Sequence, residues 1–152
     1  MRRGIVTSAL LALLAAAPAH AQRLEDRLVT VKSLTCLFTA QAKGNWTGGV
    51  PKVDVVTPKL ALQFVDIDTD DGTAKAKGEF GSSDIIVRVA SGTLHLMQSF
   101  SAGPLHVTTV FARETQPGRL LAVHTRHEFT AVALPGFTSR PEQYYGDCEL
   151  KP

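Results

Sequence analysis

Short segments of alternating apolar and polar residues, each followed by a turn sequence, make up most of the chain. In one of them, "KLALQFVDID", Leu60, Leu62 and Phe64 alternate with Ala61 and Gln63. Such alternation is typical of β-strands that bury one face. Strands are expected at 30–42, 59–68, 73–80, 84–90, 93–100, 105–113, 119–132 and 144–150. About eight strands linked mainly by hairpin-sized turns predict an all-β fold, either a single antiparallel β-barrel or a barrel-like sandwich.

The first 21 residues have the pattern of a secretory signal peptide. Arg2 and Arg3 precede the short apolar run "ALLALLAAA", and "AHA" before Gln22 fits the small-x-small cleavage rule. The run is shorter than the ~20 residues that a membrane-spanning helix needs. We expect Sec-type cleavage before Gln22, which leaves 22–152 as one domain. The mature protein is therefore expected to be periplasmic or secreted and not embedded in a membrane.

Two cysteines, Cys36 and Cys148, lie in the first and the last expected strand. An even number of cysteines in an exported chain favours a disulfide, and their spacing is far from the C-x-x-C of redox pairs. A bond closing so long a loop would stabilise the fold by ~4–5 kcal/mol in the chain-entropy model. It requires Cα atoms within ~7 Å, so the first and last strands would be neighbours, as barrel closure demands. A two-sheet sandwich could also bring them together, and two buried free thiols are the alternative to a bond.

The stretch "GNWTGGVPKVDVVTP" (44–58) is rich in glycine and proline and is expected to form a long loop. Its first three residues, Gly44, Asn45 and Trp46, resemble the G-x-W signature of lipocalins, in which the signature opens the barrel. Here the tripeptide follows the first expected strand. The resemblance implies a lipocalin-like general architecture at most.

The charge of the mature chain argues against nucleic acid as a partner. Loss of Arg2 and Arg3 lowers Lys plus Arg from 16 to 14, which equals the 14 Asp plus Glu. Nucleic-acid-binding domains usually carry a basic patch, whereas this chain has no run of Lys or Arg.

The segment "HTRHE" (124–128) does not have the spacing of a helical zinc-protease motif, and it lies in an expected strand. Alternation there places His124, Arg126 and Glu128 on one face and His127 on the other. The inner faces of the neighbouring strands are expected to hold Leu94, Leu96, Leu105, Val107 and Phe111. On that assignment His95, His106 and His124 share the outer face, with His106 near Arg126. Three histidines on adjacent strands could hold zinc, and otherwise they are solvated polar residues.

The same alternation predicts that His127 faces the interior beside apolar side chains. It would then be either a packed, hydrogen-bonded residue or part of a ligand pocket. The predicted ligand-binding residues are His127, Phe129 and Phe111.

Three functional hypotheses follow. The first is an exported, non-enzymatic barrel that needs no cofactor and binds a small, partly apolar molecule inside. The second is an envelope interaction protein that uses the exposed aromatic residues of two loop segments, Trp46, Phe137, Tyr144 and Tyr145. The third is a metal-dependent enzyme that uses the histidine trio.

Overall fold

The computed structural model describes residues 16–78, 81–101, 103–129 and 140–151, in which one helix is followed by nine strands. The elements are α1 (Ala16–Thr30), β1 (Ser33–Thr47), β2 (Val50–Val56), β3 (Leu60–Asp68), β4 (Thr73–Gly78), β5 (Gly81–Ala90), β6 (Thr93–Ser99), β7 (Leu105–Gln116), β8 (Arg119–His127) and β9 (Glu142–Lys151). The prediction of a mainly antiparallel β chain is confirmed. The part of the predicted interaction loop that holds Phe137 lies outside the described residues.

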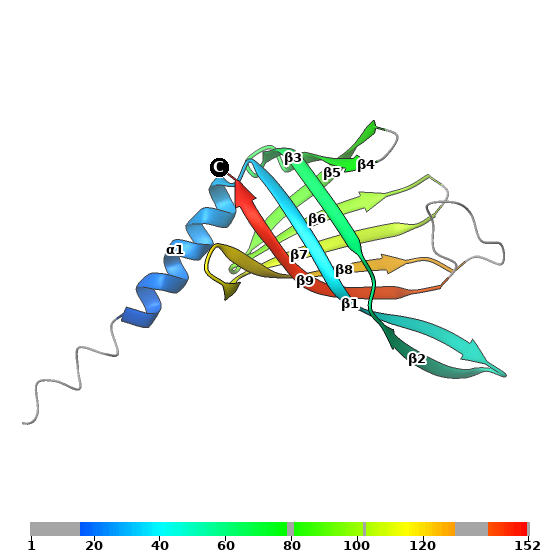
Figure 1. The fold of residues 1–152 in the computed structure, drawn as a ribbon. Helices are drawn as coiled ribbons and strands as arrows, with labels where there is room; N and C mark the ends of the chain where they lie inside the picture. The colour runs from blue at the N-terminus through cyan, green and yellow to red at the C-terminus, as the bar shows by residue number, and fades with distance from the viewer. Residues whose placement is uncertain (1–15, 79–80, 102, 130–139, 152) are drawn as a thin grey trace, which may run out of the picture.

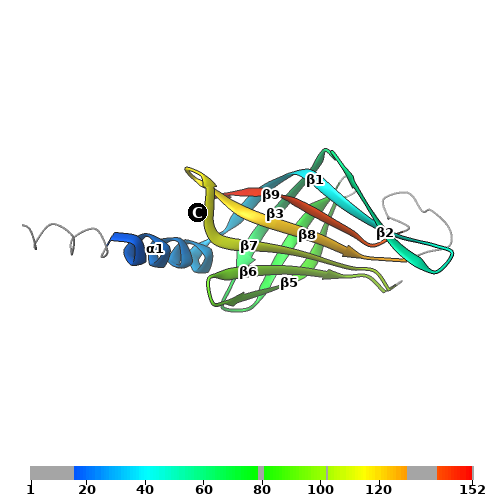
Figure 2. The ribbon, with the colours of Figure 1, turned by 90° about the horizontal axis from the view of Figure 1, so that it is seen from below.

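Eight strands close into an antiparallel barrel (Figure 1, Figure 2). From β3 to β9 each strand pairs with the next one in the chain, and β1 pairs with β3 on one side and β9 on the other. The barrel is therefore continuous, which decides between the two predicted architectures in favour of the barrel. Its interior is packed by side chains from alternate positions on every strand.

The disulfide lies where the barrel closes. Cys36 of β1 and Cys148 of β9 are directly opposite each other, bonded and fully buried, with a Cα–Cα distance of 4.0 Å. This confirms the predicted bond and the proximity of the first and last strands. Beside it, a Cβ on Gly146 would lie 2.0 Å from the carbonyl oxygen of Leu37, so only glycine fits at this close approach.

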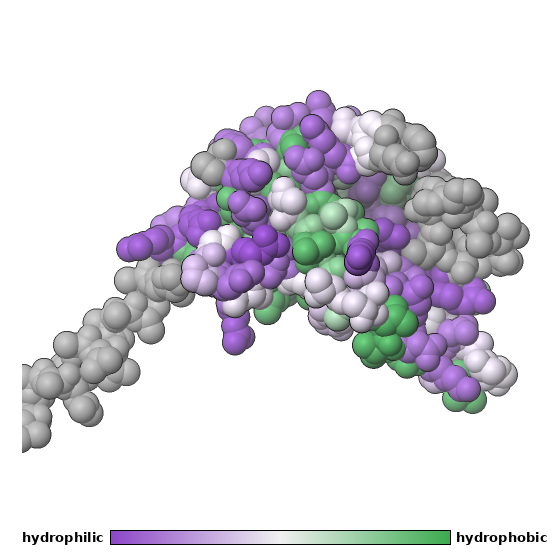
Figure 3. Space-filling model, viewed as in Figure 1, coloured by the Kyte–Doolittle hydropathy of each residue, from purple (hydrophilic) through white to green (hydrophobic). Residues whose placement is uncertain are grey.

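Beyond its pairing with β3, the second half of β1 pairs with β2 to form a ribbon, Gln41–Thr47 with Val50–Val56, while residues 41–43 also stay paired with β9. The ribbon projects beyond the barrel wall in Figure 1, and Figure 3 shows hydrophobic surface on it beside hydrophilic surface. The prediction of a long loop over 44–58 is therefore wrong. Gly48 and Gly49 have positive φ and form a two-residue hairpin turn, so the glycines mark one tight turn within a strand pair.

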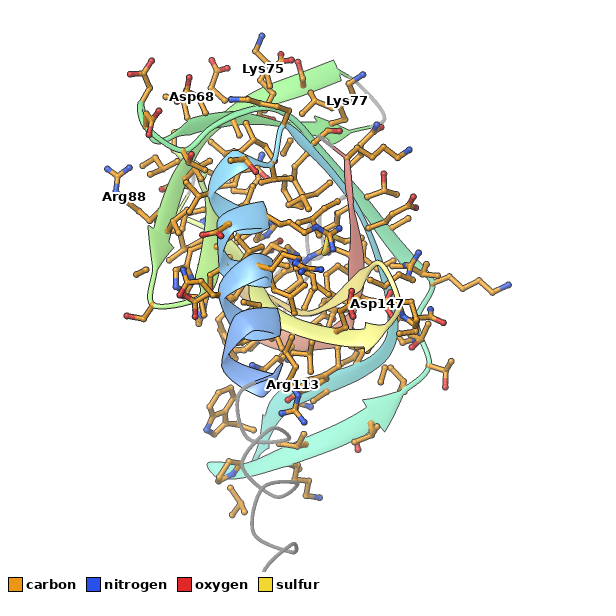
Figure 4. The ribbon with its side chains drawn as sticks, turned by 90° about the vertical axis from the view of Figure 1, so that its left-hand side faces the viewer. Asp68, Lys75, Lys77, Arg88, Arg113 and Asp147 are labelled. Carbon is orange, nitrogen blue, oxygen red and sulfur yellow. A yellow bond between two sulfur atoms is a disulfide. The ribbon has the colours of Figure 1, made fainter. Side chains whose placement is uncertain are left out.

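Helix α1 lies against the other end of the barrel (Figure 4). Leu24 and Leu28, four residues apart, share one helix face and are buried in the core. The hydroxyl of Thr69 donates a 2.6 Å hydrogen bond to the carbonyl of Val29, which ties the helix to the β3–β4 turn. Within the described residues, no helix has the length and hydrophobicity needed to cross a membrane. The helix begins at Ala16, before the cleavage point expected at Gln22, and cleavage there stays a prediction.

Candidate ligand site inside the barrel

Polar side chains gather inside the barrel at the end away from α1. They come from β7, β8 and β9 and the residue that follows β8: His106, Thr108, His124, Arg126, Glu128, Glu142 and Tyr144. All of these except Arg126 are buried. Strand alternation explains the grouping, since residues two apart share a face, and the β7–β8 register places His106 directly opposite Arg126 as predicted.

The predicted inner faces of β7 and β8 are inverted. On β8 the inward residues are Leu120, Ala122 and His124, whereas the predicted ligand residue His127 is exposed. Phe129 follows β8 and is 63% exposed, so its ring does not pack inside the barrel either.

On β7 the predicted inner residues were Leu105, Val107 and Phe111. The buried residues are instead His106, Thr108 and Val110. The reason is that this part of the interior is polar, so the more apolar side of each strand is not the inner one. Because side chains alternate between the two faces of a strand, assigning the wrong inner face reverses the predicted orientation of every residue in that strand.

The predicted histidine trio is not assembled. His106 and His124 point inward with ring centroids 5.7 Å apart. His95 lies on the other face of its strand, because its neighbours Leu94 and Leu96 are buried, and its ring nitrogens bond the hydroxyls of Thr93 and Thr109. Within the described ranges no three His, Cys, Asp or Glu side chains converge as a metal site would require.

His124 is a neutral, hydrogen-bonded residue at the centre of the cluster. The Nε of Arg126 donates to its Nε2 at 3.3 Å, so the ring proton is on Nδ1, which donates to the hydroxyl of Thr108 at 2.8 Å. Burial lowers the pKa of His124 to about 3, and the positive charge of Arg126 acts in the same direction. The ring is therefore neutral near pH 7 and too weak a base for proton abstraction there.

His106 forms a buried pair with Glu128. Its Nε2 donates to Oε1 of the carboxylate, and Phe100 packs edge-on against the imidazole at 4.9 Å. Burial lowers the pKa of His106, although the bond to Glu128 opposes this shift. The second oxygen of Glu128, Oε2, is buried and has no hydrogen-bond partner among the described residues.

A second carboxylate is held on β9. The hydroxyl of Tyr144 donates to Oε2 of Glu142, and Lys43 lies 3.4 Å from Oε1. Burial, together with the bond to Glu142, raises the pKa of Tyr144, so the phenol stays protonated. The guanidinium of Arg126 lies over the Tyr144 ring at 5.3 Å, a cation–π contact that fixes its position.

Four residues of the cluster, His106, Thr108, His124 and Arg126, lie in one wall of a cavity of about 220 Å³. The opposite wall comes mainly from β3, β5 and β6 and is largely apolar, with Leu62, Phe64, Ala76, Ile85, Leu96 and Phe100, and Gln63, Lys77 and Ser83 also line the cavity. The polar wall presents Gln98, His106, Thr108, His124 and Arg126. This division suits a small molecule that has one apolar part and one polar part.

Sequence reasoning grouped His124, Arg126 and Glu128 on one face but placed that face outside. It missed Glu142 and the inward orientation of Tyr144. The available signal was the repeated placement of polar residues at alternate positions of β7 and β8, His106 and Thr108 on one strand, His124 and Arg126 on the next.

No protein-family model, curated protein or solved structure matches this chain.

Proposed function

We propose that the protein is an exported, non-enzymatic binding protein whose barrel holds a small molecule with an apolar body and an anionic head. The observation that carries this proposal is the divided lining of the interior cavity. A disulfide at the closing seam is typical of oxidising compartments and supports export.

The apolar wall sets the size and character of the ligand body. A cavity of about 220 Å³ is smaller than the ~300–1,000 Å³ of sites that take drug-sized molecules, so the ligand is small. Phe64, Ile85 and Leu96 are buried side chains that would surround an alkyl or aromatic group. Each methylene transferred to such surroundings contributes ~0.8 kcal/mol.

Arg126 is the group that would bind the head. Its Nε is committed to His124, and the contact with Tyr144 holds the guanidinium in place. Among the described residues it forms no ion pair, and the carboxylates of the cluster contact other groups: Oε1 of Glu128 contacts His106, and Glu142 contacts Tyr144 and Lys43. Its terminal nitrogens therefore keep donors for a carboxylate, for which a guanidinium is well shaped.

Calorimetric titration of the mature protein with octanoate and octanol tests the proposal. We expect one octanoate per chain, and we expect Arg126→Gln to weaken its binding by about tenfold or more, since hydrogen bonds to charged groups contribute ~1.5–3 kcal/mol. Octanol binding should change little, which also shows that the variant cavity is intact. The exposed Arg113 provides the matched control, Arg113→Gln. Absence of binding by both compounds would reject the proposal, and equal losses for both would reject the role of Arg126.

The alternative prediction, an interaction module, is supported by exposed aromatic side chains rather than by the cavity. Trp46 and Tyr145 are exposed, although Tyr144 is buried in the cluster. Trp46 lies near the end of β1 on the β1–β2 ribbon, with its ring centroid 5.8 Å from that of Phe129, whereas the G-x-W signature of lipocalins opens the barrel.

A further inference from the structure

The β1–β2 ribbon exposes an apolar face. Trp46, Pro51, Val53 and Val55 alternate with polar residues and share one side of the ribbon, as the β1–β2 register shows. Trp46 is 50%, Val53 67% and Val55 79% exposed. Large side chains exposed together on one surface are typical of an interaction site.

Strand β2 is also an open edge. It pairs with β1 alone and is the terminal strand of the sheet, so one side of its backbone has no strand partner in the described part of the chain. Unpaired strand edges bind other strands readily unless they are blocked.

The direction of the free backbone groups follows from Gly44. Its N–H donates to the carbonyl of Pro141, on the side of β1 away from β2. Gly44 is opposite Val53, so this is a non-hydrogen-bonded pair of the ribbon, and Val53 directs its own N–H and C=O to the open edge. The two-residue turn at Gly48 and Gly49 gives the same alternation, because the pair that flanks such a turn is hydrogen-bonded.

Residues 51, 53 and 55 therefore present the edge groups of β2. Pro51 has no N–H, but its carbonyl remains an acceptor. Residues 52 and 54 direct their backbone groups to β1 and their side chains, a lysine and an aspartate, to the other face of the ribbon, which also carries Val50 and Val56.

We propose that two copies of this protein associate by antiparallel pairing of their β2 strands, with Val53 opposite Val53 on the twofold axis. In this register Val53 exchanges two hydrogen bonds with its counterpart, and each Val55 N–H donates to the other copy's Pro51 carbonyl. Lys52 of each copy lies opposite Asp54 of the other, in non-hydrogen-bonded pairs where side chains are closest.

Charge selects this register over its neighbours. The two nearest registers that still pair the outward backbone groups of both strands differ from this one by two residues. They place Lys52 opposite Lys52 in one direction and Asp54 opposite Asp54 in the other. Like charges directly opposite destabilise a strand pair. The central register alone gives two opposite-charge pairs and brings the Val53 and Val55 side chains of the two copies onto one continuous apolar face. This complementarity of the strand with itself is why a second copy, rather than a foreign peptide, is the partner.

Charge exchange at the two positions tests the pairing. Sedimentation equilibrium of the mature protein should show a concentration-dependent dimer, and Lys52→Asp or Asp54→Lys should each raise the dimer dissociation constant by about tenfold. The double variant Lys52→Asp with Asp54→Lys should restore dimerisation, because opposite charges again face each other. Lys59→Asp, an equal charge change at an exposed residue after β2, is the control and should leave the dimer unchanged.

Three results would overturn the proposal. A wild-type protein that is monomeric at all concentrations excludes self-association. A dimer that ignores both single substitutions is formed through another surface. A double variant that stays monomeric while its circular dichroism matches the wild type shows that Lys52 and Asp54 do not face each other, as expected if β2 receives a different protein strand.

Discussion

Acid should destabilise the protein through His124. The folded state lowers the pKa of this residue from 6.5 to about 3, because burial and the charge of Arg126 disfavour the imidazolium. Between these two values the unfolded chain binds a proton that the folded chain does not, so the free energy of unfolding falls as the pH falls. Above pH 6.5 both states are neutral at this position and the stability is complete.

The size of the effect follows from the shift. Each pH unit in this window lowers the free energy of unfolding by about 1.4 kcal/mol, so lowering the pH from about 7.5 to 5 should remove about 2 kcal/mol through His124 alone. His106, whose pKa is also lowered by burial, adds to the loss in the same direction. Above pH 5 most carboxylates have not yet begun to titrate, so the histidines dominate the change.

Urea unfolding of the mature protein, followed by circular dichroism at several pH values, measures this loss. His124→Gln keeps polar atoms beside Thr108 and Arg126 but does not titrate, so its free energy of unfolding should fall by about 2 kcal/mol less between pH 7.5 and 5. His127→Gln removes an exposed imidazole from the same strand and should retain the wild-type pH dependence. If His124→Gln and the wild type lose stability equally, the buried neutral histidine is not the cause.

Two further predictions concern the seam and the N-terminus. Gly146→Ala should lower the free energy of unfolding by about 1–3 kcal/mol or more in urea, because its Cβ would overlap the Leu37 carbonyl; Gly44→Ala, whose Cβ would have ordinary contacts, should change it much less, and similar losses for both would refute the steric argument. N-terminal sequencing of the exported protein should begin at Gln22; an uncleaved chain would contradict the predicted signal peptide.

The antiparallel all-β fold could be predicted because the sequence pattern that specifies it is local and repeated. Period-two patterns with turn sequences between them specify hairpins, and a disulfide between the first and the last strand favours closure, although the pattern alone leaves a sandwich as the alternative. The ribbon is not predicted because "VPKVDVV" lies in a stretch rich in glycine and proline, a composition that is typical of loops. Only the β1–β2 register shows that Gly48 and Gly49 make one turn and that Pro51 lies at a strand edge.

The site was harder to predict because its polar residues are inside. Hydrophobicity predicts that Val107 and Phe111 point into the barrel. His106 and Thr108 point inward instead, because other side chains satisfy their polar atoms by hydrogen bonds. Such satisfaction depends on cross-strand neighbours that a single strand does not reveal. The proximity of His106 and Arg126 could be predicted from the position of the turn between their strands, although bulges shift the register between Val110 and Gln116.

Native mass spectrometry of the protein purified from its own host tests the central claim, a ligand inside the barrel, most directly. We predict one small molecule bound non-covalently to each wild-type chain and displaced by octanoate, and strongly depleted in Arg126→Gln purified in the same way. A chain that carries no bound mass and takes up no octanoate would contradict the claim.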